Sequence, residues 1–256
     1  QSSLDPQHYW DWRGGVVIVT GASSGIGAAA AKAFSTEGAK VVMVGRNQVK
    51  LDAVAKKCKD PLVIRADVSK DDDVHRIIDQ TVKKYGQIDV LVNNAGSASG
   101  VCGLLDDVFM KSYDSIMNTN IRGVVHLTSL AGPHLIKTKG NVINISSVAG
   151  KAAPTFPGFS NYHVSKAALD HFTRCAAVEL GVHGVRVNTI SPGPVVTDFL
   201  ENAGTTTTHE DVKGITLLNR VSESEEISDL ILFLAGDKAR GITGSDFVSD
   251  NGVLIK

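Results

Sequence analysis

The chain has 256 residues, of which 43% are hydrophobic and 21% are charged, and its formal net charge is −1 at pH 7. This composition is typical of a globular protein with a large core, and a nearly neutral chain lacks the electrostatic signature of a protein that binds nucleic acid or anionic membranes. No apolar run approaches the roughly 18 residues that a transmembrane helix needs.

The cysteines and the first residues bear on the compartment. Cys58, Cys102 and Cys175 are odd in number and far apart, which fits neither a disulfide framework nor a zinc site and indicates a reducing, cytoplasmic compartment. The opening stretch QSSLDPQHYWDWRGG has neither the basic n-region nor the apolar h-region of a signal peptide. We therefore expect residues 1–12 to be a lead-in or an expression remnant, and residues 13–256 to form one domain.

The first predicted element is a strand that runs into a glycine turn and a helix. Residues 16–19 (VVIV) are apolar and β-branched, as in a strand buried on both faces, and Gly21, Gly25, Gly27 and an alanine-rich helical run follow. Such a turn directs backbone N–H groups and the positive end of the helix toward a pyrophosphate. The spacing G-x-x-x-G-x-G differs from the general G-x-G-x-x-G fingerprint, but the strand before it and the helix after it predict dinucleotide binding.

Strands and helices then alternate along the chain. The predicted strands cover residues 16–19, 40–44, 61–68, 88–92, 141–147, 185–191 and a short segment near 247–249. The predicted helices follow the glycine turn and cover residues 48–58, a segment capped by Ser69 with an acidic first turn, a long region to about 137 interrupted near 118–123, and residues 160–181 and 223–235. This rhythm predicts an α/β fold, a Rossmann-type doubly wound sheet of about seven parallel strands with helices on both faces.

One irregular segment departs from this alternation. Residues 197–219, with four consecutive threonines at 205–208, are too polar for the core. They follow the carboxyl end of a predicted strand, where open α/β sheets bind ligands. The composition fits a substrate lid and a mobile surface loop equally, and both interpretations stay open.

The candidate catalytic residues lie in NYHVSKAALDHF. Tyr162 and Lys166 are four residues apart and share one face of the predicted helix. A free phenol has a pKa near ~10, and a nearby ammonium favours the phenolate, which brings the pKa toward the working pH. Ser146 and Ser147 end the preceding strand and can reach the same ligand, although a plain turn also explains them. His163 points about 100° away from Tyr162 and is assigned to packing or to the surface. No histidine pair has metal-ligand spacing, so no metal site is expected.

Four motifs in register, TGASSGIG, NNAG, YHVSK and SPG, resemble those of the short-chain dehydrogenase/reductase family. The similarity runs from about residue 16 to the C-terminus and is closest to the single-domain branch with 3-oxoacyl reductase-like and carbonyl reductase-like members. It implies an oxidoreductase that transfers hydride between a nicotinamide cofactor and a carbonyl or secondary alcohol. Residues 13–256 would then be a single dinucleotide-binding catalytic domain, with residues 197–219 as the lid.

The resemblance also implies a role for each matching residue of the catalytic group. Tyr162 would act as the acid–base that protonates the carbonyl oxygen, and Ser147 would hydrogen-bond that oxygen, with Ser146 ranked second. Lys166 would lower the pKa of the tyrosine and bind the nicotinamide ribose. Asn120 would hold a water that links the lysine to solvent, with Asn118 as the alternative.

The cofactor residues follow from the same resemblance. They are Gly21, Ser23, Gly25, Ile26 and Gly27 at the pyrophosphate and adjoining ribose, Asp67 and Val68 at the adenine, Asn94, Ala95 and Gly96 on the ribose side, and Pro192, Gly193 and Thr197 at the nicotinamide carboxamide. Asn93 is expected to be a structural clamp between strands, and Pro192-Gly193 is also a plain turn.

The end of the second strand bears on the choice of coenzyme. An acidic residue there would accept the ribose hydroxyls and repel a 2′-phosphate, but this chain has Gly45 followed by Arg46. Because arginine binds phosphate well, NADP(H) is favoured over NAD(H). Two observations weigh against this: Ser24 stands where many NADP-preferring relatives carry a basic residue, and Arg46 also fits a solvated strand end.

The expected partner is a small carbonyl or alcohol substrate, with no nucleic acid and no membrane. A lipophilic ketone and a 3-oxoacyl thioester fit the motifs equally well. The resemblance further implies a homotetramer built through helices near 105–137 and 160–181. A dinucleotide-binding regulator or scaffold without turnover is the alternative from another class. A sugar-nucleotide epimerase or dehydratase is disfavoured by the glycine spacing and the lack of a separate substrate domain.

Overall fold

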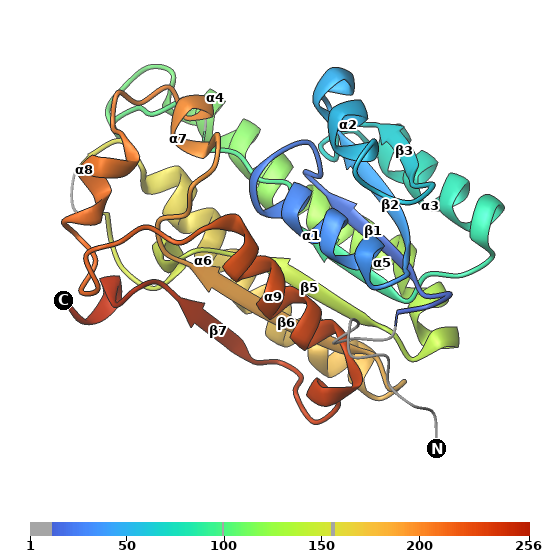
Figure 1. The fold of residues 1–256 in the computed structure, drawn as a ribbon. Helices are drawn as coiled ribbons and strands as arrows, with labels where there is room; N and C mark the ends of the chain where they lie inside the picture. Colours follow the sequence, from blue (N-terminus) through green and yellow to red (C-terminus); the bar gives the residue numbers. More distant parts are fainter. Residues whose placement is uncertain (1–11, 99, 155–156) are drawn as a thin grey trace.

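The computed structural model describes residues 12–98, 100–154 and 157–256, so the predicted lead-in, apart from Trp12, lies outside the described residues. One sheet in the strand order β3-β2-β1-β4-β5-β6-β7 runs through the molecule, with helices on both sides (Figure 1). Neighbouring strands pair in parallel throughout, which confirms the predicted doubly wound sheet. The strands are β1 Val16–Thr20, β2 Lys40–Gly45, β3 Leu62–Arg65, β4 Val90–Asn93, β5 Asn141–Ile145, β6 Arg186–Pro192 and β7 Asp246–Ser249.

The helices also follow the prediction, except for the cap at Ser69 and for two short helices within residues 197–219, a segment predicted to be irregular. They are α1 Gly25–Thr36, α2 Gln48–Ala55, α3 Asp71–Tyr85, α4 Phe109–Met117, α5 Gly123–Thr138, α6 Ser160–Gly181, α7 Phe199–Asn202, α8 His209–Lys213 and α9 Ser224–Ala235. A π-helical turn, Asn118–Arg122, joins α4 to α5 at the expected interruption, and a 3₁₀ turn, Val148–Gly150, follows β5. The predicted cap Ser69 is wrong: Lys70 precedes α3, and the Ser69 hydroxyl donates instead to Asp67 at 2.8 Å.

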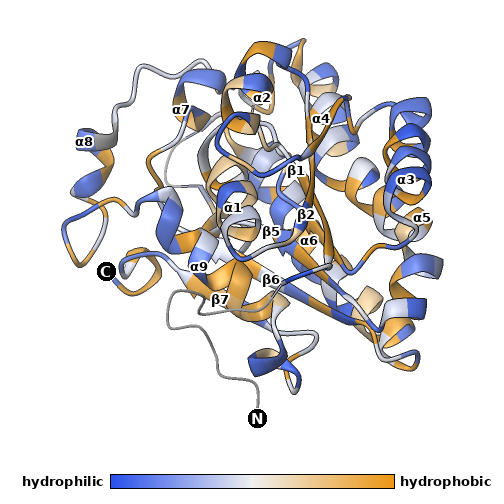
Figure 2. Cartoon of the chain, turned by 45° about the vertical axis from the view of Figure 1, so that its right-hand side comes forward, coloured by the Kyte–Doolittle hydropathy of each residue, from blue (hydrophilic) through white to orange (hydrophobic). Residues whose placement is uncertain are grey.

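Two layers of apolar side chains hold the helices to the sheet. Alternate residues of β1 belong to different layers: Val17 and Val19 pack with α1, α2 and α9, whereas Val16 and Ile18 pack with α3, α5 and α6. Each such fully buried side chain contributes about 1.5–3 kcal/mol relative to exposure. Figure 2 shows the corresponding pattern, with hydrophobic colour along the strands and a largely hydrophilic α3 on the outside. Burial on both faces explains why the strand sequences are continuously apolar.

The strands end at a common edge of the sheet. Gly21 follows β1, Gly45 ends β2, Asn94 follows β4, Ser146 follows β5 and Pro192 ends β6. The strand order reverses between β1 and β4, and in open α/β sheets a ligand crevice forms at the carboxyl ends beside such a reversal. Figure 1 shows α7, α8 and the C-terminus at this same edge.

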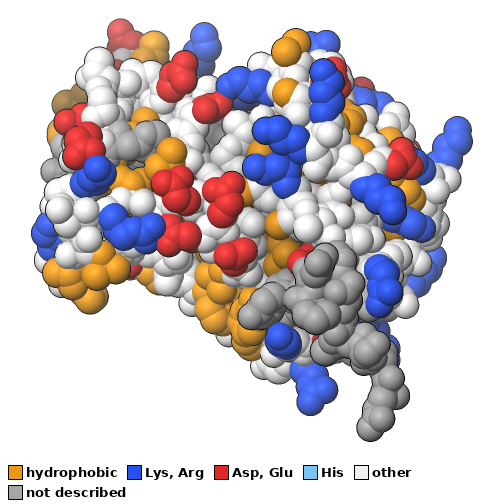
Figure 3. Space-filling model, viewed as in Figure 1, with side chains coloured by type: hydrophobic (Ala, Val, Ile, Leu, Met, Phe, Trp, Pro, Cys, Tyr) orange, Lys and Arg blue, Asp and Glu red, His pale blue; other side chains and the backbone are white. Residues whose placement is uncertain are grey.

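The surface charges, the helix lengths and the possible metal ligands bear on whether the fold carries other kinds of binding site. On the face shown in Figure 3, acidic and basic side chains lie in separate small groups and not in one continuous patch of a single sign. Within residues 12–98, 100–154 and 157–256, no helix is long and apolar enough to cross a membrane, and no cluster of three or more ligating side chains is placed to hold a metal. All three cysteines are free.

Gly27 is required by packing within the turn itself. A Cβ there would lie 2.3 Å from the carbonyl oxygen of Gly21 and 2.5 Å from Nδ2 of Asn94, and backbone cannot easily move aside. We expect Gly27→Ala to lower the free energy of unfolding by about 1–3 kcal/mol, as overpacking does elsewhere. Chemical denaturation measures this difference. The matched control is Gly214→Ala, because a Cβ at Gly214 meets nothing within 4 Å and φ there is −60°. Equal stability of the two variants would contradict the prediction.

Candidate functional site

A cavity of about 930 Å³ opens at the carboxyl edge of the sheet. It is lined by the turn after β1, the ends of the strands and the segment that leads into α7. The predicted cofactor residues that line it are Gly21, Ser23, Gly25, Ile26, Arg46, Asp67, Val68, Asn94, Ala95, Gly96, Pro192, Gly193 and Thr197. Gly27 does not line the cavity, because it is buried against the turn.

The glycine turn forms a cradle that fits a diphosphate. Gly21 and Gly25 have φ values of +67° and +52°, which side chains rarely adopt. A Cβ on Gly25 would lie 2.7 Å from the methyl group of Thr197, so this glycine lets the two walls of the cavity approach each other. No side-chain hydrogen bond caps α1 at Ser24, which leaves the first N–H groups of the helix to an anion.

Two guanidinium groups flank the end of β2. Arg46 follows Gly45 directly, and the strand register places Arg65 of β3 opposite Gly45. Both arginines line the cavity, and Arg46 is exposed. No acidic residue occupies the end of β2. This corner of the cavity therefore carries the positive charges of the two arginines, and Gly45 between them has no side chain to fill it. Arg46 was predicted from its place after the second strand, but Arg65 was missed, because strand register is not visible in the sequence.

An ion pair bridges two walls of the cavity. The Lys50 ammonium in α2 lies 2.5 Å from the Asp198 carboxylate, just before α7, and both residues line the cavity. The hydrogen bond between them raises the pKa of Lys50 and lowers the pKa of Asp198. The pair is partly exposed and therefore contributes little to stability. No sequence motif connects these residues, which are 148 positions apart.

Tyr162 and Lys166 share one face of α6, as their spacing predicts. The Lys166 Nζ lies 5.6 Å from the centre of the Tyr162 ring and donates a 2.8 Å hydrogen bond to the carbonyl oxygen of Ile145, at the end of β5. Lys166 is buried, with 4% of its surface exposed, and both residues line the cavity. The Phe199 ring packs against Tyr162 with 5.3 Å between centroids. The phenol is thereby held between the helix and the start of α7.

Burial sets the protonation of this pair. It raises the pKa of Tyr162 to about 12, while a hydrogen bond with Ser147 acts in the opposite direction. Burial also lowers the pKa of Lys166 to about 8, and the negative charge of Asp170 opposes that change. The expected lowering of the tyrosine pKa by Lys166 is therefore not what the structure gives: burial is the larger influence on this pKa, only the Ser147 hydrogen bond opposes it, and the Lys166 ammonium donates its hydrogen bond to Ile145. At neutral pH the phenol carries its proton.

The two serines after β5 have different surroundings. Ser147 lines the cavity, accepts a 3.1 Å hydrogen bond from the backbone N–H of Ala149 and caps the 3₁₀ turn. Its hydrogen bond with Tyr162 brings its hydroxyl to the phenol. Ser146 also lines the cavity, but it is buried and its hydroxyl donates to the carbonyl oxygen of Lys166 at 3.3 Å. This geometry favours Ser147 as the residue that meets a ligand beside Tyr162.

Asn120 lies beneath the cavity in the π-helical turn. Its side-chain amide donates 2.9 Å hydrogen bonds to the carbonyl oxygen of Ser97 and the hydroxyl of Ser165, and its oxygen accepts from the N–H of Ser97 at 2.8 Å. The amide donors are thus engaged within the chain, and the role of Asn120 in holding a water stays a prediction. π-Helical turns often occur at functional sites. Asn118, the alternative, begins the same turn.

Asn93 has the predicted clamp geometry, since its amide donates to Asn144 at 2.9 Å and to Thr128 at 3.2 Å.

The structure also brings residues to the cavity that the motifs did not indicate. The unpredicted wall is largely apolar and consists of Val148, Phe199, Leu200, Asn202, Val212, Ile215 and Val253. Most of these residues belong to the 197–219 segment, whose polar composition hid the apolar positions that face the cavity.

Comparisons with known proteins show which family this chain resembles. Residues 21–254 match the family model described as Enoyl-(Acyl carrier protein) reductase. The chain is 35% identical over 249 residues to the 3-oxoacyl-(acyl-carrier-protein) reductase FabG of Thermotoga maritima, covering 94% of this chain and 98% of that protein. It is 35% identical to the meso-2,3-butanediol dehydrogenase of Serratia marcescens, covering 93% of each. A short-chain dehydrogenase/reductase of unknown function from Caenorhabditis elegans, solved with cofactor, superposes with a TM-score of 0.90 at 32% identity, over 96% of this chain and 97% of that one.

The chain belongs to the short-chain dehydrogenase/reductase family. The four sequence motifs therefore identified the family correctly. Short-chain dehydrogenases/reductases of this group are oxidoreductases that act on carbonyl and alcohol groups of small molecules with a nicotinamide cofactor. The cavity, the glycine cradle and the Tyr162–Lys166 pair are the parts of this chain that fit such chemistry.

Proposed function

We propose that this short-chain dehydrogenase/reductase is an NADP(H)-dependent carbonyl reductase and alcohol dehydrogenase for uncharged, largely apolar ketones, with Tyr162 as its acid–base residue. The observation that carries the proposal is the meeting of Tyr162, Ser147 and Lys166 at one cavity that is also lined by a group of apolar side chains. Because Tyr162 and Lys166 are both present and line this cavity, a regulator or scaffold without turnover is not favoured.

Tyr162 supplies the proton in the direction of reduction. The nicotinamide, when bound, supplies or accepts the hydride. The carbonyl oxygen of the substrate accepts hydrogen bonds from the hydroxyls of Tyr162 and Ser147, and negative charge develops on that oxygen as reduction proceeds. The Tyr162 phenol stays protonated at neutral pH because its pKa is high, so its proton is available to the substrate oxygen. The Lys166 ammonium stabilises the phenolate that remains.

The cofactor is held by groups whose chemistry suits each of its parts. The N–H groups at the start of α1 and the Gly21–Gly25 turn suit the diphosphate. Arg46 and Arg65 suit a 2′-phosphate, because guanidinium groups bind phosphate with paired, charge-assisted hydrogen bonds. No carboxylate stands at the end of β2 to prefer free ribose hydroxyls. These features support NADP(H) over NAD(H).

The apolar wall supports the substrate class. Val148, Phe199, Val212 and Val253 come from separate parts of the chain and line the cavity with Tyr162. A ketone with an apolar body buries surface there at about 25 cal/mol per Å², whereas a charged group placed against these four side chains would lose hydration and gain no polar partner from them. We place the substrate body against this wall, with residues 197–219 as its lid.

A 3-oxoacyl thioester is the second candidate. Two relatives at 35% and 36% identity are named 3-oxoacyl-(acyl-carrier-protein) reductases, and the family model carries an acyl-carrier-protein name. Steady-state oxidation of NADPH with a panel decides between the two: apolar cyclic ketones, a 3-oxoacyl N-acetylcysteamine thioester and charged keto acids. The proposal expects kcat/KM to be greatest for the ketones. Preference for the thioester supports the second candidate, and preference for keto acids contradicts both.

A charge placed in the apolar wall tests where the substrate lies. Val212 is half-buried, and a valine side chain that a substrate covers completely contributes about 1.5–3 kcal/mol to apolar contact. We therefore expect Val212→Asp to raise the KM for an apolar ketone roughly 10-fold and to leave the KM for NADPH unchanged. Initial-rate kinetics measure both constants. The matched control is Val182→Asp just after α6, where the valine is 80% exposed and does not line the cavity. Equal effects of the two substitutions would place the substrate elsewhere.

The assembly and the compartment remain part of the proposal. Exposed apolar side chains such as Met110 on α4, Val125 on α5 and Val178 on α6 support a homotetramer built through these helices. Light scattering at several protein concentrations tests this: a fourfold monomer mass supports it and a stable monomer contradicts it. The free cysteines support a reducing, cytoplasmic setting.

A further inference from the structure

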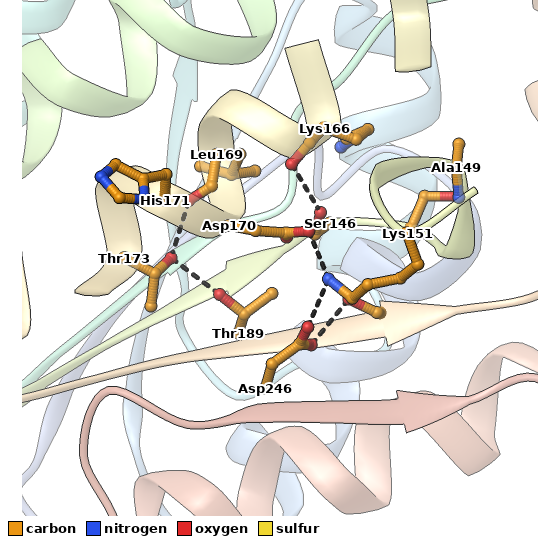
Figure 4. Close-up of polar contacts among 12 residues, drawn as sticks. Ser146, Ala149, Lys151, Lys166, Leu169, Asp170, His171, Thr173, Thr189 and Asp246 are labelled. Atoms are coloured by element: carbon orange, nitrogen blue, oxygen red, sulfur yellow. Dashed lines mark hydrogen bonds and ion pairs between the residues drawn. The ribbon is translucent and has the colours of Figure 1, made fainter. Parts of the chain in front are cut away.

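A cluster of charges lies behind the catalytic pair, on the side away from the cavity. Lys151, just after the 3₁₀ turn that Ser147 caps, makes ion pairs with Asp170 of α6 and Asp246 of β7 (Figure 4). The hydroxyl of Ser191 on β6 donates a 2.7 Å hydrogen bond to Asp246. The cluster therefore ties together three elements that are far apart in the sequence.

Asp170 is the buried member of the cluster. Only 7% of its side chain is exposed, compared with 23% for Lys151 and 25% for Asp246. Its Oδ1 is buried without a hydrogen-bond partner among the described residues, so its charge is only partly compensated. A Cβ added to Gly150 would lie 2.5 Å from Oδ2 of Asp170, which shows how closely the Ser147 turn rests on this carboxylate.

The same carboxylate lies one helical turn from Lys166. Asp170 follows Lys166 by four residues on α6, as Lys166 follows Tyr162, so the three side chains share one face of the helix. Ser146, next to Ser147, donates a hydrogen bond to the backbone carbonyl oxygen of Lys166 and so also joins the end of β5 to α6. Two carboxylates and one ammonium leave the cluster with a net charge of −1 behind the catalytic lysine.

We propose that Asp170, with Lys151 and Asp246, is a positioning residue: the cluster fixes the Ser147 turn against α6 and keeps Lys166 positively charged inside the protein. The inference rests on the proposed function of Tyr162 and Lys166. Burial lowers the pKa of Lys166, and the negative charge of Asp170 acts against this lowering, which supports the inference.

The surrounding titratable groups are few. On α6, Tyr162 and Asp170 are the titratable neighbours of Lys166. From the packed elements, β5 presents the carbonyl oxygen of Ile145 to Lys166, and β6 presents the hydroxyl of Ser191 to the cluster. Within the part of the chain that the structure describes, the charged side chains that reach Asp170 from other elements are Lys151 and, through it, Asp246.

Opposite charge changes give the proposal a sharp test. Asp170→Asn removes a negative charge near Lys166, so we expect the pKa of Lys166 to fall by about 0.5–1. Lys151→Met removes a positive charge, so we expect the pKa to rise. A purely structural role would move both variants in the same direction or neither. NMR of the whole protein with ¹³C-labelled lysine measures this pKa without turnover, with the Lys166 signal assigned through Lys166→Arg.

The pH profile of ketone reduction gives the second readout. On the alkaline side of the profile, the pH at which kcat/KM falls to half is expected to move down in Asp170→Asn and up in Lys151→Met. Lys151→Arg keeps the positive charge and is expected to restore the wild-type profile. Lys137→Met, which removes an exposed lysine of α5, is the control and shifts neither value. If Asp170→Asn does not fold, Asp246→Asn takes its place, with a smaller downward shift expected.

The outcomes separate this inference from the proposed function. Opposite shifts of the Lys166 pKa support the inference whether or not a substrate is found. Shifts in one direction, or none, overturn it even if Tyr162 proves to be the acid–base residue. Shifts in the NMR titration without matching shifts in the pH profile would contradict the proposed role of Lys166 in turnover.

Discussion

Tyr162→Phe is expected to lower kcat for ketone reduction by about 10³-fold, within the 10²–10⁴-fold range that a positioned general acid contributes. The substitution removes the proton donor and leaves the ring that packs on Phe199 at 5.3 Å. The dissociation constant for NADPH, measured by fluorescence titration, should change less than about twofold. Single-turnover kinetics at saturating ketone separate the chemical step from binding.

Tyr85→Phe is the matched control for this loss. Tyr85 lies at the end of α3 and its hydroxyl makes only a 3.5 Å contact with the carbonyl oxygen of Asp60. The same atom is removed there, outside the cavity, and kcat should stay unchanged. If Tyr162→Phe retains more than about a tenth of the wild-type kcat, another group delivers the proton and the assignment fails.

Arg46→Asp is expected to reverse the preference for coenzyme. Loss of a charge-assisted hydrogen bond of about 1.5–3 kcal/mol lowers kcat/KM for NADPH by roughly 10- to 100-fold. The new carboxylate repels a 2′-phosphate and accepts free ribose hydroxyls, so kcat/KM for NADH should rise. Initial rates with both coenzymes at one ionic strength measure the ratio.

The control for charge alone is Lys56→Asp, an exposed position just after α2 that does not line the cavity. It changes the net charge of the protein by the same amount as Arg46→Asp. An equal loss of NADPH use in both variants would attribute the effect to the overall field of the protein. A wild-type preference for NADH would overturn the assignment of Arg46 directly.

The parts of the fold that depend on local pattern were predictable. Apolar β-branched runs, glycine at fixed positions and alternating helices determine the sheet, and α6 matches its predicted range of residues 160–181. The cap at Ser69 was not predictable, because the hydroxyl has a second acceptor in Asp67. Competing hydrogen bonds of this kind are decided by local geometry that the residue types do not specify.

The proximity of Tyr162, Lys166 and Ser147 was predictable for a related reason, whereas several other residues that line the cavity were not. Tyr162 and Lys166 occur in one short motif, YHVSK, and Ser147 was predicted from its place at the end of the preceding strand. Arg65 and the Lys50–Asp198 pair reach the cavity only through strand register and through contact between distant segments. The pKa of Tyr162 was wrong in direction at the sequence level, because burial can be measured only in the folded chain.

The most direct test is a crystal structure of the protein with NADP⁺ and a slowly reacting alcohol or ketone analogue. The account predicts the Tyr162 hydroxyl within about 2.6–3.2 Å of the substrate oxygen, as a proton donor requires, with Ser147 as the second partner of that oxygen. A substrate oxygen held by other groups, with the Tyr162 hydroxyl beyond hydrogen-bonding reach of it, would contradict the central claim.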